Sequence, residues 1–195
     1  MSNSMTREPV ALKEWAVTVN ALRDGELIMV LRKGGIEEET RDFQLVSKGF
    51  YLMPAYEHQK EHLLKAPYQG RIESIMEGWS PDMDSIKLGA YAEAVHDIEI
   101  NDQETLDRLR EFHIWTDKFS EERLKWKRTK PLHLLLLRVY RLAEPAELEM
   151  FPAYTGCKSW VKLEKDLADA AMVPVLSDEE FASQVAQIQA ALCRQ

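Results

Sequence analysis

Hydrophobic positions near the start of the chain first follow a helical spacing and then run together. Trp15, Val19 and the apolar residues around them recur every three or four positions, which predicts a helix over 10–23 that stops at Asp24-Gly25. The next segment, 26–33, is too apolar and β-branched for a loop and ends at two glycines. We therefore expect a buried strand there.

A partial alternation of apolar and polar residues then predicts a second strand over 43–53, with Gly49 as a bend or bulge. Pro54 is expected to open a helix over 55–65. The interval 70–100 is expected to be extended in parts, on either side of a polar loop.

Beyond residue 100, residues that can cap helices precede two short amphipathic segments. Asn101 and Ser120 are expected to be these N-caps. The strongest strand signal follows at 131–142, whose centre includes four consecutive leucines. Such a continuous apolar run predicts burial on both faces, as in the middle of a sheet or in a closed barrel.

The C-terminal part of the chain is predicted to be mostly helical. Residues 165–173 favour a helix, and Ser177 with Glu180 forms a capping-box pattern ahead of a second helix over 178–193. The apolar stripe that should pack this second helix on the body is Phe181, Val185, Ile188 and Leu192.

Together these elements predict a single α+β domain. It should have a twisted or barrel-like mixed sheet with peripheral helices, and its C-terminal helix should pack on the body. The sheet is expected to contain 26–33, 43–53 and 132–142. Along the chain we expect a flexible N-terminus over 1–9, a core domain over 10–165 and a C-terminal helical extension over 166–195.

The composition is that of an ordinary globular chain. Its 195 residues are 45% hydrophobic and 30% charged, which argues against a disordered or fibrous protein and fits one domain. The longest apolar run is far below the roughly 18 residues of a membrane helix, and the N-terminus lacks a signal-peptide pattern. Two cysteines, Cys157 and Cys193, cannot build a disulfide framework. These features predict a reduced, cytoplasmic protein without a membrane partner.

Charge is unevenly distributed along the chain. The net charge is −8, yet residues 123–141 contain seven basic side chains and no acidic one. Such a run is typical of a local phosphate-binding surface, although a basic loop paired with neighbouring acidic helices would have the same pattern. The acidic total argues against indiscriminate binding of duplex DNA.

The first group of candidate ligand-binding residues lies at the end of the strand predicted over 26–33. These residues are Arg32, Lys33, Gly34 and Gly35. Glycines allow a close approach of the backbone to a ligand, and an arginine can hold a phosphate with two hydrogen bonds. The alternative is a tight turn with solvated charges.

The second group lies in the basic run. Trp126 stands between Lys125 and Lys127, and an aromatic ring flanked by cations suits stacking on a nucleic-acid base. Arg138 completes the ligand-binding candidates. A half-buried tryptophan with lysine stems packed along it is the alternative.

His58, His113 and Cys157 are the candidates for catalysis. His58 and His62 are four residues apart, but the residues between them do not match the H-E-x-x-H pattern of a zinc-binding helix. Cys157 could act as a thiolate beside Lys158, with a buried and inert cysteine as the alternative. A zinc site built from the three candidates has no characteristic spacing, so neither a metal nor a cofactor is predicted.

Several short motifs occur together along the chain. They are LKEWA at 12–16, LRKGGI at 31–36, F-x-L-x-P-x-x-x-HQ at 50–59, HIW at 113–115, LLLRVYRL at 135–142 and GCKSW at 156–160. Their joint pattern resembles a bacterial family known by the domain-of-unknown-function label 1802, over about residues 11–163. The resemblance implies no particular activity, and the last 30 residues are expected to lie outside it.

A second resemblance is at the level of the fold. The segment ALRDGELIMVLRKG at 21–34 and the late strand at 133–142 are similar to parts of PUA-like and activating-signal-cointegrator-homology domains. That resemblance implies binding of RNA or modified bases in a cleft beside the first loop. Glu26 and Leu27 depart from the Gly-x-Lys loop of those domains.

The sequence leaves three functions open. The leading hypothesis is a binding module for a phosphate-bearing ligand, with RNA, single-stranded DNA or a nucleotide as the partner. The alternatives are a hydrolase or phosphodiesterase that uses His58, His113 or Cys157, and a protein-interaction subunit. The oligomeric state is not predicted.

Overall fold

The computed structural model describes residues 7–33, 43–126 and 130–194. The strands in these ranges are β1 (Val10–Trp15), β2 (Met29–Arg32), β3 (Gly49–Ala55), β4 (Ser85–Ile100), β5 (Leu132–Glu149), β6 (Trp160–Lys162) and β7 (Met172–Pro174). The α-helices are α1 (Ala16–Arg23), α2 (Arg71–Met76), α3 (Gln103–Asp107), α4 (Asp117–Lys125) and α5 (Asp178–Leu192). Short 3₁₀ turns are η1 (Glu61–Leu63), η2 (Ala66–Tyr68), η3 (Arg110–Phe112) and η4 (Pro152–Tyr154).

The strands of the described residues form one mixed sheet in the order β2-β5-β4-β3-β1-β6, with β7 also paired to β5. Strands β1 and β3 are parallel, and the other pairs are antiparallel. Within the described residues β2 and β6 end this order, so the sheet is open and does not close into a barrel. The predicted α+β domain with a mixed sheet is confirmed.

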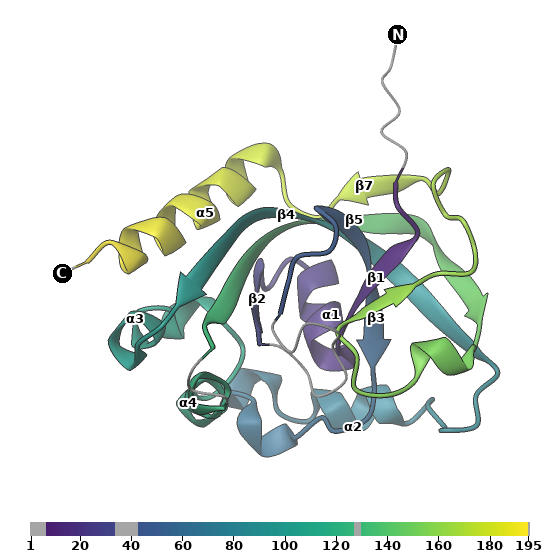
Figure 1. The fold of residues 1–195 in the computed structure, drawn as a ribbon, viewed down its shortest axis with the longest axis horizontal. Helices are drawn as coiled ribbons and strands as arrows, with labels where there is room; N and C mark the ends of the chain where they lie inside the picture. The colour runs from purple at the N-terminus through teal and green to yellow at the C-terminus, as the bar shows by residue number, and fades with distance from the viewer. Residues whose placement is uncertain (1–6, 34–42, 127–129, 195) are drawn as a thin grey trace, which may run out of the picture.

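The long strands β4 and β5 arch over α1, and α5 lies on the outer side of the arch (Figure 1). The leucines at 134–137 are fully buried on β5, between β2 and β4, as their continuous run predicted. The main core fills the space between α1 and the sheet, with Val17 and Leu22 among its members. Full burial of one leucine side chain contributes about 1.5–3 kcal/mol to the stability of the folded state.

The helix predicted over 10–23 is wrong in its first half. Residues Val10–Trp15 form β1, which pairs with β3 on one edge and with β6 on the other. These pairings satisfy the backbone of the segment as a strand and outweigh its helical spacing. The second half forms α1, which ends as predicted: Gly25 has a φ of 78°, and the N–H of Glu26 donates to the Ala21 carbonyl.

The helix predicted over 55–65 is also wrong. Pro54 lies inside β3, where pairing with β4 has already ended at Tyr51, so its missing N–H leaves no gap in that ladder. After β3 the chain forms only the short turns η1 and η2 before α2. His58 and His62 therefore do not share a helix.

Three further segments differ from their predictions. The strand expected over 43–53 begins only at Gly49, which starts β3 instead of bending it. Part of the interval 70–100 expected to be extended is the helix α2, and β4 starts at Ser85. Residues 165–173 are not helical, because β7 begins at Met172 and pairs with β5.

The helix caps lie close to their predicted places. Asp102 caps α3 where Asn101 was expected, and Thr116 caps α4 where Ser120 was expected. In both cases the cap side chain accepts an N–H from three residues further on. A polar residue near a helix start is easily recognised, but the sequence does not fix where the first turn closes.

The C-terminal helix is confirmed as α5. Ser177 and Glu180 form the predicted capping box. Ile188 is fully buried, and the other stripe residues, Phe181, Val185 and Leu192, pack half-buried against the main core. Among the described residues, no helix is long and apolar enough to cross a membrane.

Candidate functional site

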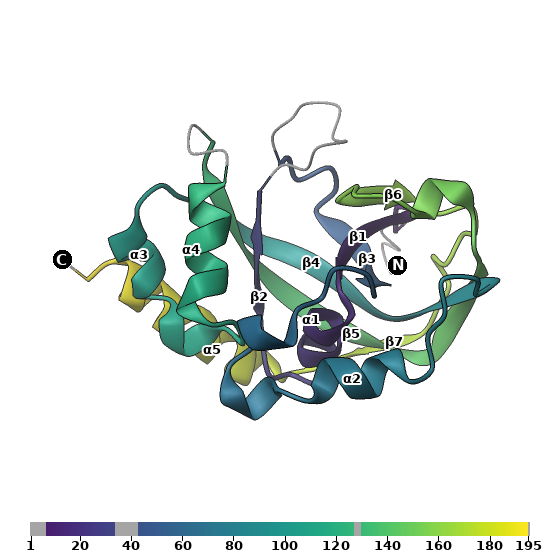
Figure 2. The ribbon, with the colours of Figure 1, turned by 90° about the horizontal axis from the view of Figure 1, so that it is seen from below.

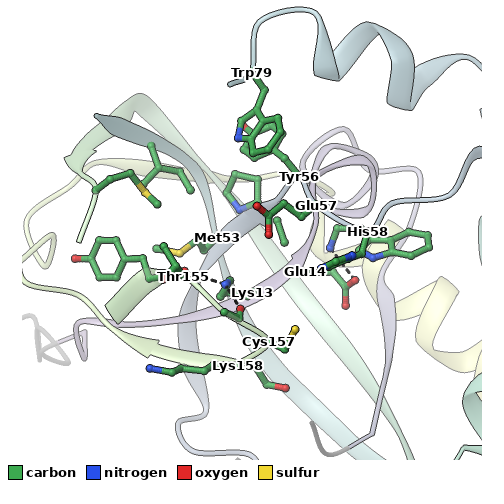
Figure 3. A pocket seen from close by; sticks show the side chains of 18 of the residues that line it. Lys13, Glu14, Met53, Tyr56, Glu57, His58, Trp79, Thr155, Cys157 and Lys158 are labelled. Carbon is green, nitrogen blue, oxygen red and sulfur yellow. Dashed lines mark hydrogen bonds between the residues drawn. The ribbon is translucent and has the colours of Figure 1, made fainter. Parts of the chain in front are cut away.

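A pocket of about 660 Å³ opens at the carboxyl ends of the parallel strands β1 and β3. Because parallel strands end at the same edge of a sheet, the chain leaves β1 into α1 beside the turn at 56–59 that follows β3. The remaining wall includes the ends of β2 and α4, the segment 78–81 after α2 and the loop 154–159 (Figure 3). A pocket of this size suits a small organic ligand.

The pocket brings together five of the residues that the sequence singled out: Arg32, Lys33, His58, Trp126 and Cys157. Three others, His113, Lys125 and Arg138, do not line it. Gly34, Gly35 and Lys127 lie outside the described residues. The pocket thus brings the two candidates at the end of β2 together with Trp126 of the basic run. Lys125 and Arg138 of that run lie outside the pocket.

Arg32 is held in a buried ion pair. Its Nη1 lies 3.0 Å from Oε2 of Glu14, and its Nη2 donates to the Ser159 hydroxyl at 2.6 Å. Both charged groups are more than nine-tenths buried. Burial of two charges is costly, and their attraction compensates only when hydrogen bonds satisfy both groups. The pair fastens β2 to β1, while the buried Nε of Arg32 has no hydrogen-bond partner among the described residues.

Lys33 also serves the fold. It is almost fully buried, and its Nζ donates to the Leu124 carbonyl near the end of α4 at 2.6 Å. Burial lowers the pKa of its ammonium group. A cation at a helix C-terminus is favourable for the helix dipole. Figure 2 shows α4 beside β2, where this bond ties the two elements together.

Arg123 differs from both of these cations. It lies in the last turn of α4, half-buried, with its guanidinium 5.0 Å from the centre of the Phe119 ring. The pKa of the Arg123 guanidinium is lowered. Desolvation is the largest cause, the charge of Glu14 raises the pKa in part, and the charge of Arg32 lowers it further. Among the described residues, its guanidinium makes no hydrogen bond and no ion pair within 4.0 Å. The sequence had placed Arg123 in the basic run without naming it as a ligand-binding residue.

The loop 154–159 is held by Lys13 of β1. The Lys13 ammonium donates to the carbonyls of Tyr154 and Gly156 at 2.8 and 2.7 Å. Gly156 has a φ of 84°, which favours glycine. This loop carries Cys157 and Lys158, both exposed, along one side of the pocket (Figure 3).

His58 has an unusual backbone conformation. Its φ of 65° lies in the left-handed region that few non-glycine residues adopt. The next side chain, Gln59, accepts the Val17 N–H at 2.9 Å and donates to the Tyr56 carbonyl at 3.1 Å. Gln59 therefore ties the turn at 56–59 to the start of α1, and this tie holds His58 in the pocket wall.

An aromatic pair was missed by the sequence reasoning. The rings of Tyr56 and Trp79 stack with their centroids 5.7 Å apart and their planes inclined by 15°. Burial raises the pKa of the Tyr56 phenol. The two residues belong to different loops, so no local spacing connects them. The available signal was a large aromatic residue in a polar loop, between Gly78 and Ser80.

His113 lies elsewhere and is built into the core. It is buried beside Trp115, with the ring centroids 5.6 Å apart. Desolvation, followed by the nearby charge of Lys65, lowers the pKa of its imidazole to about 4. The ring is therefore neutral near pH 7, and it is not placed to act in the pocket.

The two basic candidates outside the pocket have acidic partners. Lys125 is exposed on α4 and lies 3.3 Å from Glu121. Arg138 lies under the start of α5, where it pairs with Asp178 at 2.7 Å and donates to the Ser177 carbonyl. For these two residues the structure matches the alternative of basic residues paired with neighbouring acidic ones.

The pocket itself is electrically positive. Of the described residues that line it, six are lysine or arginine and three are glutamate. This local excess contrasts with the net charge of −8 for the whole chain. Across the described part of the chain, no three His, Cys, Asp or Glu side chains are grouped so that they could hold a metal ion.

Comparison with protein families identifies the chain. A family model described as "Domain of unknown function (DUF1802)" matches residues 11–187. The chain belongs to this family. The match confirms the resemblance found in the motifs, and it extends beyond the expected end near residue 163 into α5. The C-terminal helix of this DUF1802 protein is thus largely within the family's domain.

Other comparisons add less. No curated protein matches the sequence. Among solved structures, the chain is similar to the crystal structure of a mutant ZmASCH protein from Zymomonas mobilis, with 9% identity and a TM-score of 0.42. The alignment covers 93% of this chain and 96% of that chain. We draw no conclusion from a likeness this weak, and the expected similarity to PUA-like domains stays a prediction.

Proposed function

We propose that the pocket binds a phosphate-bearing ligand, either a free nucleotide or one nucleotide of an RNA or single-stranded DNA chain. The observation that carries this proposal is the guanidinium of Arg123. It is half-buried in a positive pocket, and among the described residues it has no ion-pair partner. A cation that is desolvated without a partner is unfavourable, and a phosphate would supply both the missing charge and the acceptors.

The neighbouring charges support an anionic ligand. Glu14 is already paired with Arg32, and Lys33 is bound to a carbonyl, so the buried groups near Arg123 hold more positive than negative charge. Trp126 follows Arg123 at the end of α4 and lines the same pocket, which places an aromatic ring near that cation. Cations combined with aromatic rings are the usual means of binding single nucleotides.

Isothermal titration calorimetry with inorganic phosphate and the four ribonucleoside monophosphates tests the proposal. Arg123→Gln should weaken binding at least tenfold, since a hydrogen bond to a charged group contributes about 1.5–3 kcal/mol. Arg110→Gln is the matched control, because Arg110 is an exposed arginine outside the pocket that pairs with Asp117. Equal affinities of the wild-type protein and Arg123→Gln would contradict the proposal.

A second candidate function, phosphodiester hydrolysis, is favoured by one observation. His58 lines the pocket in a strained conformation that Gln59 fixes, and such strain often accompanies function. An exposed imidazole could accept a proton from a water molecule that attacks the phosphorus, while the P–O bond to the leaving sugar oxygen breaks and that oxygen takes a proton from solvent. Incubation with dinucleotides should then release mononucleotides, and His58→Gln should abolish the release. A wild-type protein that binds nucleotides but never cleaves a dinucleotide would leave only the binding function.

A further inference from the structure

The side of the pocket formed by Tyr56 and Trp79 is aromatic. The two rings are nearly parallel and stack on each other. They lie across the pocket from Cys157 and Lys158, with Lys13 between the two sides (Figure 3). Tyr56 comes from the turn after β3 and Trp79 from the segment after α2. The wall therefore has a different chemical character from the charged region around Arg123.

Trp79 has no role in the hydrophobic core. Within the described residues it is half-buried, yet it packs against neither of the two core clusters, whereas Tyr56 packs against the smaller one. An indole is one of the largest apolar groups in proteins, and its burial normally stabilises a core or an interface. Here the ring stacks on Tyr56 and lines the pocket.

The surroundings of the aromatic wall are also apolar. Met53 and Ile86, both buried, and the half-buried Met150 line the pocket together with it. Thioether groups make favourable contacts with aromatic rings. The pocket thus offers a flat apolar surface in one region and, in another, the Arg123 guanidinium, which forms no ion pair with a described residue.

We infer that the pocket selects nucleotides over other phosphates by stacking the nucleobase on the Tyr56–Trp79 wall. This inference rests on the proposed function, to which it adds the surface that recognises the base. The stacking face of a paired base in a duplex is covered by its neighbours, whereas an unpaired base exposes it. The wall therefore favours a free nucleotide or an unpaired one, and it accepts every base because each has a π face.

The experiment compares three ligands on the full chain by calorimetry: a ribonucleoside monophosphate, ribose 5-phosphate and inorganic phosphate. The nucleotide should bind about fivefold to a hundredfold more tightly than ribose 5-phosphate. This range corresponds to the stacking energy of one base on an aromatic side chain. Equal affinities for the nucleotide and ribose 5-phosphate would overturn the inference and leave the proposed function intact.

Substitutions of Trp79 and Arg123 distinguish the contribution of the aromatic wall to binding from that of the cation. Trp79→Leu should remove most of the preference for the nucleotide over ribose 5-phosphate, while Trp79→Phe should keep most of it. Arg123→Gln should weaken the binding of both ligands and leave the ratio of their affinities nearly unchanged. A Trp79→Leu protein that retains the full preference would overturn the inference. Failure of all three ligands to bind the wild-type protein would overturn the proposed function together with it.

Discussion

Arg32 and Arg123 line the same pocket and carry the same charge, but their guanidinium groups have different partners. Arg32 is paired with Glu14 and bonded to Ser159, so its charge contributes to holding β2 against β1. Arg123 makes no ion pair with any described residue and contacts the Phe119 ring. A basic residue in a pocket is therefore a candidate for ligand binding only if the fold does not already use its donors.

His113 and His58, the two histidines proposed as catalytic candidates, differ in the same way: one is used by the fold and the other is not. His113 is buried and neutral beside Trp115, whereas His58 is exposed and lines the pocket.

The largest effect is expected at the buried ion pair. Glu14→Gln leaves Arg32 buried without an anion, and removal of one partner from a buried pair costs about 3–5 kcal/mol. The free energy of unfolding, measured with urea, should fall by that amount. Glu57→Gln is the control, because Glu57 is an exposed glutamate of the same pocket and should change stability by less than about 0.5 kcal/mol. Equal effects of the two substitutions would refute the assignment of Glu14 to the fold.

Acid should destabilise the protein through His113. Its folded pKa of about 4 lies below the value near 6.5 expected in the unfolded chain. Between these values the unfolded state binds a proton that the folded state does not, so stability falls as pH decreases from 6.5 to 4. The loss attributable to this group is on the order of 3 kcal/mol. Urea unfolding at several pH values should show a flatter profile for His113→Phe than for the wild-type protein and His58→Gln, and the same profile in all three would contradict the prediction.

The electrostatic contribution of Arg123 should appear in the salt dependence of nucleic-acid binding. For a single strand, log K should fall by about 0.7 per neutralised phosphate for each unit of log salt. Arg123→Gln should reduce the slope by about that amount, whereas Lys125→Gln should change it less, because Lys125 already pairs with Glu121. Filter binding from 50 to 200 mM salt measures both slopes. No association of an oligonucleotide even at about 50 mM salt would restrict the ligand to a free nucleotide.

Helices and strands that are determined by residues close together in the chain could be predicted from the sequence. The leucines at 134–137 predicted a doubly covered strand, and Ser177 with Glu180 predicted the start of α5. The segment 10–15 was mistaken for a helix because its strand state depends on partners in β3 and β6 that lie far away in the chain. The turn at 56–59 likewise depends on a bond from Gln59 to α1.

The candidate site was predicted in part for the same reason. Arg32, Lys33 and Trp126 have recognisable sequence contexts, and all three line the pocket. The sequence could not show that Glu14 forms an ion pair with Arg32, because residue type alone does not reveal a partner 18 positions away. Nor could it pair Tyr56 with Trp79, whose stacking depends on the packing of two separate loops.

The smallest effect is expected for the stability of Trp79 variants. Trp79 packs against neither core cluster of the described residues, so Trp79→Leu mainly removes its stacking on Tyr56 and should lower the free energy of unfolding by about 0.5–1.5 kcal/mol. Trp115 provides the comparison: it is almost fully buried and stacks on Phe119 at 4.9 Å, and truncation of such an aromatic residue to alanine costs about 3–5 kcal/mol. Trp115→Leu keeps part of the side chain and should cost somewhat less than that. Thermal and urea unfolding of both variants measure the difference. If Trp79→Leu proved as destabilising as Trp115→Leu, the indole of Trp79 would support the fold and would not be available to stack on a ligand.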